Sequence, residues 1–198
     1  MPALLHGIRV LDFGRYIAGP YCAALLAEYG ADVIRIEKRD GSEDRFPTPV
    51  GGGAGALFLQ MNRNKRSMTL DPASPEGRKV VERMVKRADV VIANLPQATL
   101  NSMGLDYATL CSYKPDVIFV TNTAFGAVGP MHRNVGFDSV AQAMCGSVYM
   151  TGEPEQPYRA TAPWVDFGTA LHCAFGTMAA LMERQQTGKG QMVTGALL

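Results

Sequence analysis

The chain has 198 residues, 47% of them hydrophobic and 19% charged, and this composition favours one well-packed globular domain or two small ones. Its 19 basic and 18 acidic residues leave a formal net charge of +1, too little for the strong field of a nucleic-acid-binding or membrane-surface protein. The four cysteines lie far apart with no CxxC pair, and charge or glycine interrupts every apolar run, so no zinc knuckle, disulfide framework or membrane span is predicted. We therefore expect a cytoplasmic protein without metal, nucleic acid or membrane as partners.

The first 37 residues have the pattern of a strand, a helix and a second strand. Residues 7–13 are apolar and β-branched, and a loop follows them. Pro20 suits the first turn of a helix, and Gly30 can end it. Residues 31–37 then form a second apolar run. A crossover of this length predicts a right-handed βαβ unit in a parallel sheet.

The same alternation recurs downstream. Strands are predicted at residues 67–71, 89–94 and 116–124, with a helix that begins at Ser74 and Pro75 and short helices around 98–103 and 107–113. Residues 39–55 are polar and then glycine-rich, which is typical of a mobile surface loop. The predicted fold class is therefore α/β, a Rossmann-like domain with a mostly parallel sheet.

The last third of the chain changes character. Residues 135–150 and 166–186 predict two helices rich in small residues, joined by an extended, proline-containing connection. Residues 187–198 predict a further strand or helix. Because the final apolar stretch, VTGALL, is unusual for a solvated domain end, we expect a fragment or a chain that needs a partner.

No nucleotide motif fits the loops. The dinucleotide fingerprint G-x-G-x-x-G is absent after the first strand, and so is the phosphate-binding G-x-x-x-x-G-K-[ST]. Basic residues nonetheless fall at the ends of predicted strands, where doubly wound sheets bind ligands: Arg15, Lys38, Arg39, Lys65 and Arg66. Two interpretations stay open, a site for a phosphate-rich ligand and an ordinary solvated surface.

Asp166 is the acid that stands out, because it lies between an apolar dipeptide and a mostly uncharged helix. It is either the N-cap of that helix or a carboxylate kept ionised by the helix N-terminus, as a nucleophile requires. No G-x-S-x-G elbow is present, and the histidines show no motif spacing with Ser or Cys. His172, within an apolar helix, is predicted to be packed or ligand-facing rather than a general base.

Several segments together resemble the family III (CaiB/BaiF) CoA-transferases. They are GIRVLDFGRYIAGPYCAALLAEYGADVIRIEK, NRNKRSMTLD, PEGRKVVERMVKRADVVIANLPQATLNSMGLDY, VGFDSVAQAMCG and VDFGTALHCAFGTMAALMERQQTGKGQ. The resemblance implies that residues 1–198 are a Rossmann-like, CoA-binding large domain, the N-terminal part of an interlocked-dimer fold. Family members continue into a small domain, so the resemblance also implies an interlocked homodimer or a second chain that supplies the missing part.

The resemblance implies a reaction as well. The family's catalytic aspartate begins the helix before the R-x-x-T-G-x-G-Q segment, and that position here is Asp166. Its carboxylate would attack an acyl-CoA thioester to give an aspartyl anhydride and then an aspartyl-CoA thioester. CoA would then pass to a small carboxylic acid.

Contacts with CoA are implied for ten positions: Arg15, Tyr16, Ile17, Ala18, Lys38, Leu70, Asn94, Leu95, Met103 and Phe137. Some family members have an aromatic residue in place of Leu95 and an arginine in place of Ser102, so the CoA contacts here could differ. Racemases of the family carry a histidine base where this chain has Phe137, which favours CoA transfer. A 2-methylacyl-CoA racemase or epimerase and a non-catalytic CoA-binding module are the alternatives.

Overall fold

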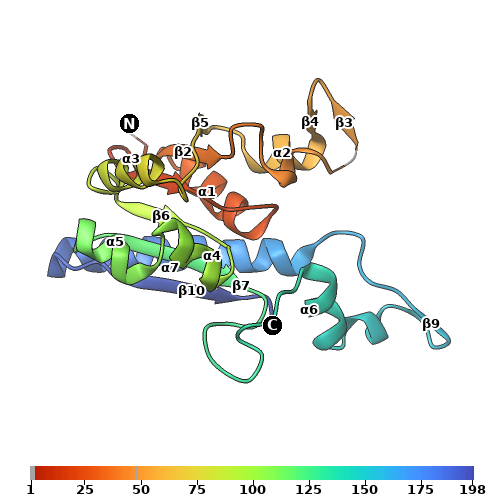
Figure 1. Cartoon of the computed structure of the whole chain (residues 1–198). Coiled ribbons are helices and arrows are strands. Elements are labelled where there is room, and N and C mark those ends of the chain that lie inside the picture. The colour runs from red at the N-terminus through yellow and green to blue at the C-terminus, as the bar shows by residue number, and fades with distance from the viewer. Residues whose placement is uncertain (1–2, 48) are drawn as a thin grey trace.

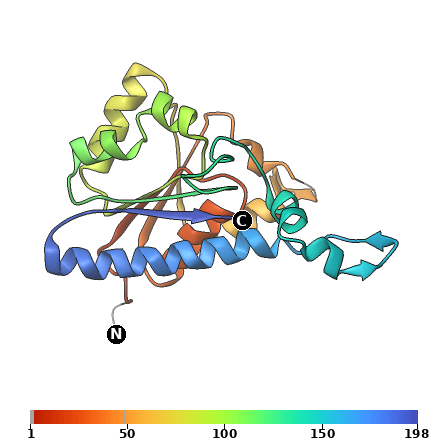
Figure 2. The same cartoon turned by 90° about the horizontal axis from the view of Figure 1, so that it is seen from below.

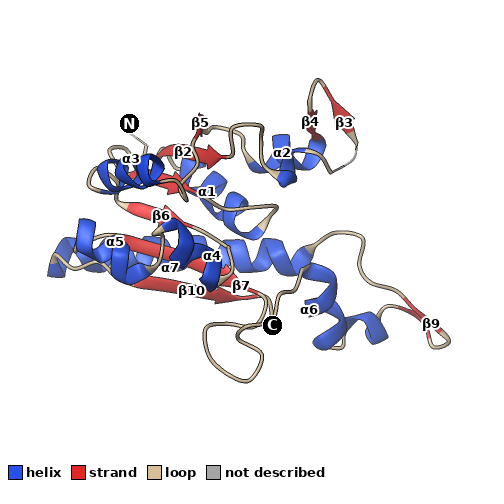
Figure 3. Ribbon diagram, in the orientation of Figure 1, coloured by secondary structure: helices blue, strands red, loops and turns tan. Residues whose placement is uncertain are grey.

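The computed structural model describes residues 3–47 and 49–198 and is built around one six-stranded parallel sheet (Figures 1 and 3). Its strands are β1 (Arg9–Asp12), β2 (Asp32–Glu37), β5 (Arg66–Thr69), β6 (Val90–Ile92), β7 (Ile118–Thr123) and β10 (Met192–Ala196). They lie in the order β10-β7-β6-β1-β2-β5, and every neighbouring pair is parallel. This is the order of a doubly wound, Rossmann-like sheet, and it confirms the predicted α/β fold class.

Helices cover both faces of the sheet (Figure 2). One face packs against α1 (Ala18–Glu28) and α7 (Trp164–Thr187), and the other against α3 (Pro75–Val85), α4 (Gln97–Met103) and α5 (Tyr107–Tyr113). Successive side chains of a strand alternate between the two layers, so Val10 belongs to the first and Leu11 to the second. Apolar residues therefore fill both layers, as expected for a parallel sheet.

Local signals set the ends of the predicted helices. The Ser74 hydroxyl accepts a hydrogen bond from the N–H of Gly77 at 3.0 Å, and Pro75 takes the first helical position of α3. Gly30, with φ of +97°, follows the end of α1. Helix α1 begins at Ala18, two residues before the predicted start at Pro20. The segment for which a strand or a helix was predicted contains strand β10.

Two segments differ from their predictions. Residues 135–150 are not one helix, because Gly146, with φ of +81°, separates α6 (Asp138–Met144) from the 3-10 turn η2 (Ser147–Met150). The segment 39–55, of which residue 48 lies outside the described residues, is not simply an exposed loop. It contains η1 (Glu43–Arg45), β3 (Val50–Gly51) and β4 (Ala54–Gly55), α2 (Ala56–Met61) follows it, and Ser42 and Asp44 are buried.

Beyond the sheet, α6, η2 and the small hairpin of β8 (Gly152–Glu153) and β9 (Gln156–Pro157) project from one end of the molecule (Figures 1 and 2). Helix α7 returns from this projection to the sheet. By length and composition α7 could cross a membrane, but one side of it, including Ala170, Cys173 and Leu181, is packed in the core. A buried helix of a sheet protein has the same composition.

Candidate active site

The loops after β1 and β6 meet where the strand order reverses, the place at which doubly wound sheets bind ligands. The Arg15 N–H donates to Asn94 Oδ1 at 2.6 Å, and Asn94 Nδ2 donates to the Arg15 carbonyl at 2.9 Å. A Cβ on Gly19 would lie 2.9 Å from the same Asn94 oxygen, so only glycine allows this approach. Asn94 thus joins two loops from neighbouring strands into one surface.

A cavity of about 350 Å³ lies beside this junction, at the carboxyl ends of β2 and β5. Four residues with implied CoA contacts line it, from four separate segments: Arg15, Lys38, Leu70 and Met103. Arg39 also lines it. Its volume is within the range of small-molecule sites, and it combines apolar walls with cations that suit phosphate groups.

The Arg15 guanidinium is occupied by the protein itself. It is almost fully buried and donates to the carbonyl oxygens of Phe13 at 2.9 Å, Gly14 at 2.7 Å and Ile36 at 3.4 Å. Burial lowers the pKa of Arg15, and the neighbouring Arg35 lowers it further. Arg15 therefore braces the loop. The exposed cations at the cavity are Arg39 and Lys38, whose Nζ also donates to Glu43 at 3.0 Å.

The other implied contacts are distributed around the cavity. Ile17 and Ala18 are buried at the start of α1, and Leu95 packs in the same apolar layer as Leu70 and Met103. Among the described residues, Ile17, Ala18, Leu95 and Asn94 do not line the cavity. They shape the loops that surround it.

Tyr16 and Phe137 link the first loop to α6. Their rings meet edge to face, with centroids 5.6 Å apart, and Tyr16 has a φ of +59°, a left-handed conformation that is rare for a bulky residue. Phe137 directly precedes Asp138, whose Oδ2 accepts the N–H of Val165 at 2.9 Å and of Asp166 at 3.2 Å. The loop that lines the cavity is thereby connected to the start of α7.

The N-terminus of α7 lies at the same edge of the sheet. The ring of Phe167 meets that of Tyr21, in the first turns of α1, edge to face at 4.9 Å. Two residues further along α7, the Thr169 hydroxyl donates to the carbonyl of Ala196, the last residue of β10, at 3.2 Å. Asp166 therefore shares the carboxyl edge of the strands with the cavity.

Asp166 does not cap α7, and the N-cap interpretation is wrong. Pro163 is the N-cap, Asp166 is the third helical residue, and the buried carboxylate of Asp138 takes the capping hydrogen bonds. Burial of Asp166, followed by repulsion from Asp138, raises its pKa to about 7, whereas a lowered pKa was expected from the helix N-terminus. A carboxyl group whose pKa is raised to about 7, at the sheet edge that also bears a ligand-sized cavity, is typical of functional sites.

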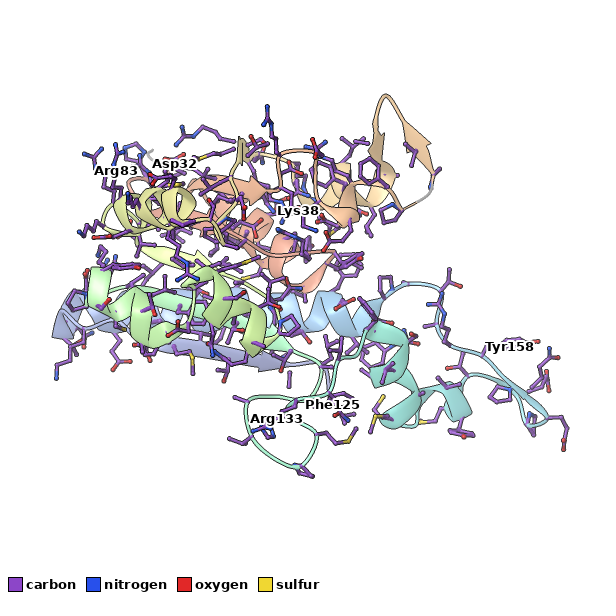
Figure 4. The ribbon with its side chains drawn as sticks, viewed as in Figure 1. Asp32, Lys38, Arg83, Phe125, Arg133 and Tyr158 are labelled. Carbon is purple, nitrogen blue, oxygen red and sulfur yellow. The ribbon has the colours of Figure 1, made fainter. Side chains whose placement is uncertain are left out.

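Two other features carry no part of the site. The larger cavity, about 430 Å³, is lined by Arg9, Arg83 and Arg87 at the amino edge of the sheet, where Figure 4 shows Arg83 and Asp32 far from Lys38. It contains none of the predicted residues, and its α3 cations stabilise a helix C-terminus. His172, predicted to be packed or ligand-facing, is exposed, so the packed alternative is wrong. Within the described ranges no group of three His, Cys, Asp or Glu side chains could hold a metal ion.

Sequence reasoning missed two acids, Asp138 and Asp44. Asp138 carries one signal, an acidic residue at the start of a predicted helix, but nothing in the sequence shows that it caps a different helix. Asp44 lies in the polar, glycine-rich segment and carries no local signal, yet it is buried and contacts the first loop.

The chain is similar throughout to known proteins. The model of CoA-transferase family III matches residues 5–198. The chain is 38% identical to the succinyl-CoA–L-malate CoA-transferase beta subunit of Chloroflexus aurantiacus, covering 98% of this chain and 49% of that protein. It is 37% identical to the succinate–glutarate CoA-transferase of Agrobacterium fabrum, covering 98% and 51%.

A solved structure supports the same assignment. The crystal structure of a CaiB/BaiF family protein from Brucella suis superposes with a TM-score of 0.94 at 37% identity, covering 100% of this chain and 54% of that one. The chain thus spans about half the length of the relatives that it matches. On these similarities the chain belongs to CoA-transferase family III.

Proposed function

We propose that the protein transfers CoA from an acyl-CoA thioester to a small carboxylic acid, with Asp166 as the nucleophile. The observation that carries this proposal is the half-buried Asp166 carboxyl group, with a pKa of about 7, at the sheet edge that also bears the cation-lined cavity. Membership of the family supports the reaction class. The raised pKa leaves a large share of the group ionised at neutral pH and makes that carboxylate more basic than an exposed one.

The proposed reaction balances in four displacements. The Asp166 carboxylate attacks the thioester carbonyl carbon, the C–S bond breaks, and CoA leaves as the thiolate. The thiolate attacks the aspartyl carbonyl of the resulting anhydride, which releases the donor acid and forms aspartyl-CoA. The acceptor carboxylate repeats the first displacement on aspartyl-CoA. The thiolate then attacks the acceptor carbonyl and regenerates Asp166.

Each part of the site has a task in this proposal. The cavity holds part of CoA, with Lys38 and Arg39 facing its phosphates. Asp138 fixes the first turn of α7 and thereby the direction of Asp166. Partial burial protects an anhydride from hydrolysis, because water competes with the thiolate for the same carbonyl.

The substrates and partners are proposed on the relatives' names. Relatives are named as transferases of succinyl-CoA with malate and of succinate with glutarate, so we infer a small dicarboxylic acid as acceptor. One related transferase has subunits named alpha and beta, which supports completion by a second chain or an interlocked homodimer. Residues 1–198 would form the CoA-binding large domain, and the unpaired cysteines support a cytoplasmic location.

A racemase would need a second base to exchange the α-proton. The edge-to-face neighbour of Tyr16 is Phe137, a hydrocarbon side chain, so this position supplies no base. In deuterated water with a 2-methylacyl-CoA, the full-length protein is expected to incorporate no deuterium at the α-carbon. Rapid exchange without acceptor-dependent transfer would favour the racemase.

The direct test is to trap the covalent intermediate. Full-length protein incubated with succinyl-CoA is expected to carry CoA on the peptide that contains Asp166, as found by peptide mass mapping. Asp166→Asn should bind CoA but show neither the adduct nor transfer. Glu183→Gln, on the exposed end of the same helix, is the matched control and should retain both. Transfer by Asp166→Asn at a rate near that of the wild type would reject the nucleophile.

A further inference from the structure

Four charged side chains form a buried cluster beneath the first βα loop. They are Asp12, Arg35, Asp44 and Lys65, each with a side chain no more than 2% exposed. Lys65 Nζ lies 2.8 Å from Asp12, Arg35 lies 3.8 Å from Asp12, and Arg35 Nη2 lies 2.7 Å from Asp44 Oδ2. Two positive and two negative charges therefore balance inside the protein, which is the condition for burying them.

The half of the cluster around Lys65 has an evident structural task. Its ammonium group also donates to the Pro20 carbonyl at 2.7 Å and to Asn62 Oδ1 at 3.0 Å, so it joins β1, α1 and α2. Although burial works to raise the pKa of Asp12, Lys65 and Arg35 hold it below its usual value. Asp12 and Lys65 thus remain a charged pair.

Asp44 connects the cluster to the loop. Its Oδ2 accepts the backbone N–H of Tyr16 at 3.2 Å as well as the guanidinium of Arg35, and Arg35 also donates to the Gly14 carbonyl. Tyr16 is the residue with φ of +59°. A non-glycine residue keeps this conformation only when its surroundings hold it. The Asp44 carboxylate is the group that binds the Tyr16 amide.

Tyr16 lies between two parts of the candidate site. On one side, Arg15 lines the cavity, and on the other, the Tyr16 ring meets Phe137. Asp44 itself belongs to η1, in the segment that follows the cavity cations Lys38 and Arg39. Asp44 therefore ties the cation-bearing segment to the loop, together with the neighbouring Glu43, whose carboxylate lies 3.8 Å from Arg15 Nε.

We propose that Asp44 is a positioning residue for CoA binding, which holds Tyr16 in its left-handed conformation and thereby keeps the first loop and the Tyr16–Phe137 pair in place next to the cavity. That the ligand is CoA rests on the proposed function, whereas the contact by which Asp44 holds the loop is independent of it. Within the described residues Asp44 Oδ1 has no hydrogen-bond partner, so Asp44 binds the Tyr16 amide and Arg35 through Oδ2 alone.

Asp89 provides a matched control. Its carboxylate also accepts one guanidinium, from Arg184 at 2.7 Å, and one backbone N–H, from Arg9 at 2.8 Å. It lies at the amino edge of the sheet, before β6, and touches neither the loop nor the cavity. Asp44→Asn and Asp89→Asn change carboxylates with the same two kinds of partner, although the Asp44 side chain is 2% exposed and that of Asp89 23%. A purely structural role of Asp44 therefore predicts a loss of stability but no selective loss of CoA affinity in the folded protein.

The test uses two measurements on the full-length protein. In Asp44→Asn, hydrogen exchange of the Tyr16 amide is expected to accelerate, and the dissociation constant for CoA, measured by calorimetry, to rise about tenfold or more. Asp89→Asn should leave both within about twofold of the wild type. Equal CoA affinity for Asp44→Asn and wild type, or an equal loss in Asp89→Asn, would overturn the proposal.

A second variant, Tyr16→Gly, distinguishes the loss of the Tyr16 conformation from a general loss of structure. Glycine adopts a positive φ without support, so in Tyr16→Gly the added Asp44→Asn change should weaken CoA binding much less than in the wild type. An undiminished loss in that background would reject the role of Tyr16. If Asp44→Asn does not fold, Asp44→Glu retains the charge, displaces the carboxylate, and is expected to change the same two measurements. A wild type that does not bind CoA would reject the proposed function, while exchange of the Tyr16 amide would still test the holding of the loop.

Discussion

Asp138 and Asp166 lie together at the start of α7, and their surroundings give them different roles. Asp138 accepts two backbone N–H groups and the side-chain amide of Gln142, which accounts for its burial. Burial disfavours the ionised form of Asp166, and the negative charge of Asp138 disfavours it further. Proteins often place two carboxyl groups in different environments, so that one has a structural role and the other takes part in the reaction.

The raised pKa of Asp166 predicts a pH-dependent stability. In the unfolded chain the group titrates near 3.8, and in the fold near 7, so folding opposes its ionisation. The contribution of Asp166 to the free energy of unfolding is most favourable below the pKa of the unfolded chain and is lost as the pH rises towards 7. Relative to Asp166→Asn, the wild type should lose on the order of 1–3 kcal/mol between about pH 4 and pH 7, allowing for partial exposure.

Urea unfolding at a series of pH values checks this expectation. Glu183→Gln, which changes an exposed carboxylate of the same helix, should follow the wild-type curve. Parallel curves for the wild type and Asp166→Asn would mean that the Asp166 pKa is close to that of an exposed group.

Single residues show how far sequence reasoning reached. The strand-end positions of Lys38 and Leu70 follow from the βαβ pattern, Met103 at the end of α4 follows from the family motifs, and these residues do line one cavity. The burial of the Arg15 guanidinium could not be foreseen, because one of its acceptors, the Ile36 carbonyl, belongs to another strand. Asp44 was missed for the same reason, since its partners come from elsewhere in the chain.

Among the elements, those with strong local signals were predicted best. Ser74 and Pro75 mark the start of α3, and β1, β2, β6 and β7 lie within the predicted runs, whereas the polar β5 begins one residue early. The prediction of a single helix over residues 135–150 was wrong, because their small side chains give no clear hydrophobic periodicity and Gly146 takes a positive φ. The packed part of 39–55 failed because buried charge pairs hold it, and such pairs leave no hydrophobic pattern.

The Lys65 side chain joins β1, α1 and the end of α2, so its loss should destabilise them together. Lys65→Met removes the partner of a fully buried Asp12 carboxylate, and breaking a buried pair costs about 3–5 kcal/mol of unfolding free energy. Lys79→Met, at an exposed pair with Glu76, is the control and should change little.

Chemical denaturation measures both variants. Adding Asp12→Leu to Lys65→Met is expected to recover part of the loss, because an unpaired buried charge is worse than an apolar pair of similar volume. A destabilisation by Lys65→Met no larger than that by Lys79→Met would show that Asp12 does not depend on Lys65.

At the scale of the whole molecule, the outer side of α7 is unusual. Four large apolar residues are exposed at helical spacing along it: Trp164, Leu171, Phe175 and Met182. Tyr149 and Met150, on the projecting η2 turn, are 81% and 89% exposed. Isolated apolar residues are common on protein surfaces, but a continuous stripe marks an interaction surface.

We therefore expect the 198-residue chain to self-associate through the α7 stripe, the set of four residues just defined. Light scattering and sedimentation at concentrations on the order of tens of micromolar should detect species larger than the monomer. Phe175→Lys, at a residue that is 77% exposed, places a charge in the middle of the stripe and should shift the population towards the monomer without unfolding it.

Tyr29→Lys replaces an aromatic residue that is also exposed but lies at the end of α1, away from the stripe, so it should leave the association unchanged. An equal effect of both substitutions would indicate that added charge alone prevents association. A wild-type chain that stays monomeric would contradict the expected association. It would show that the α7 stripe can remain in contact with solvent without the additional residues of the relatives. A selective effect of Phe175→Lys would instead place the contact on the outer side of the helix that carries Asp166, so that association and the candidate site would share one element.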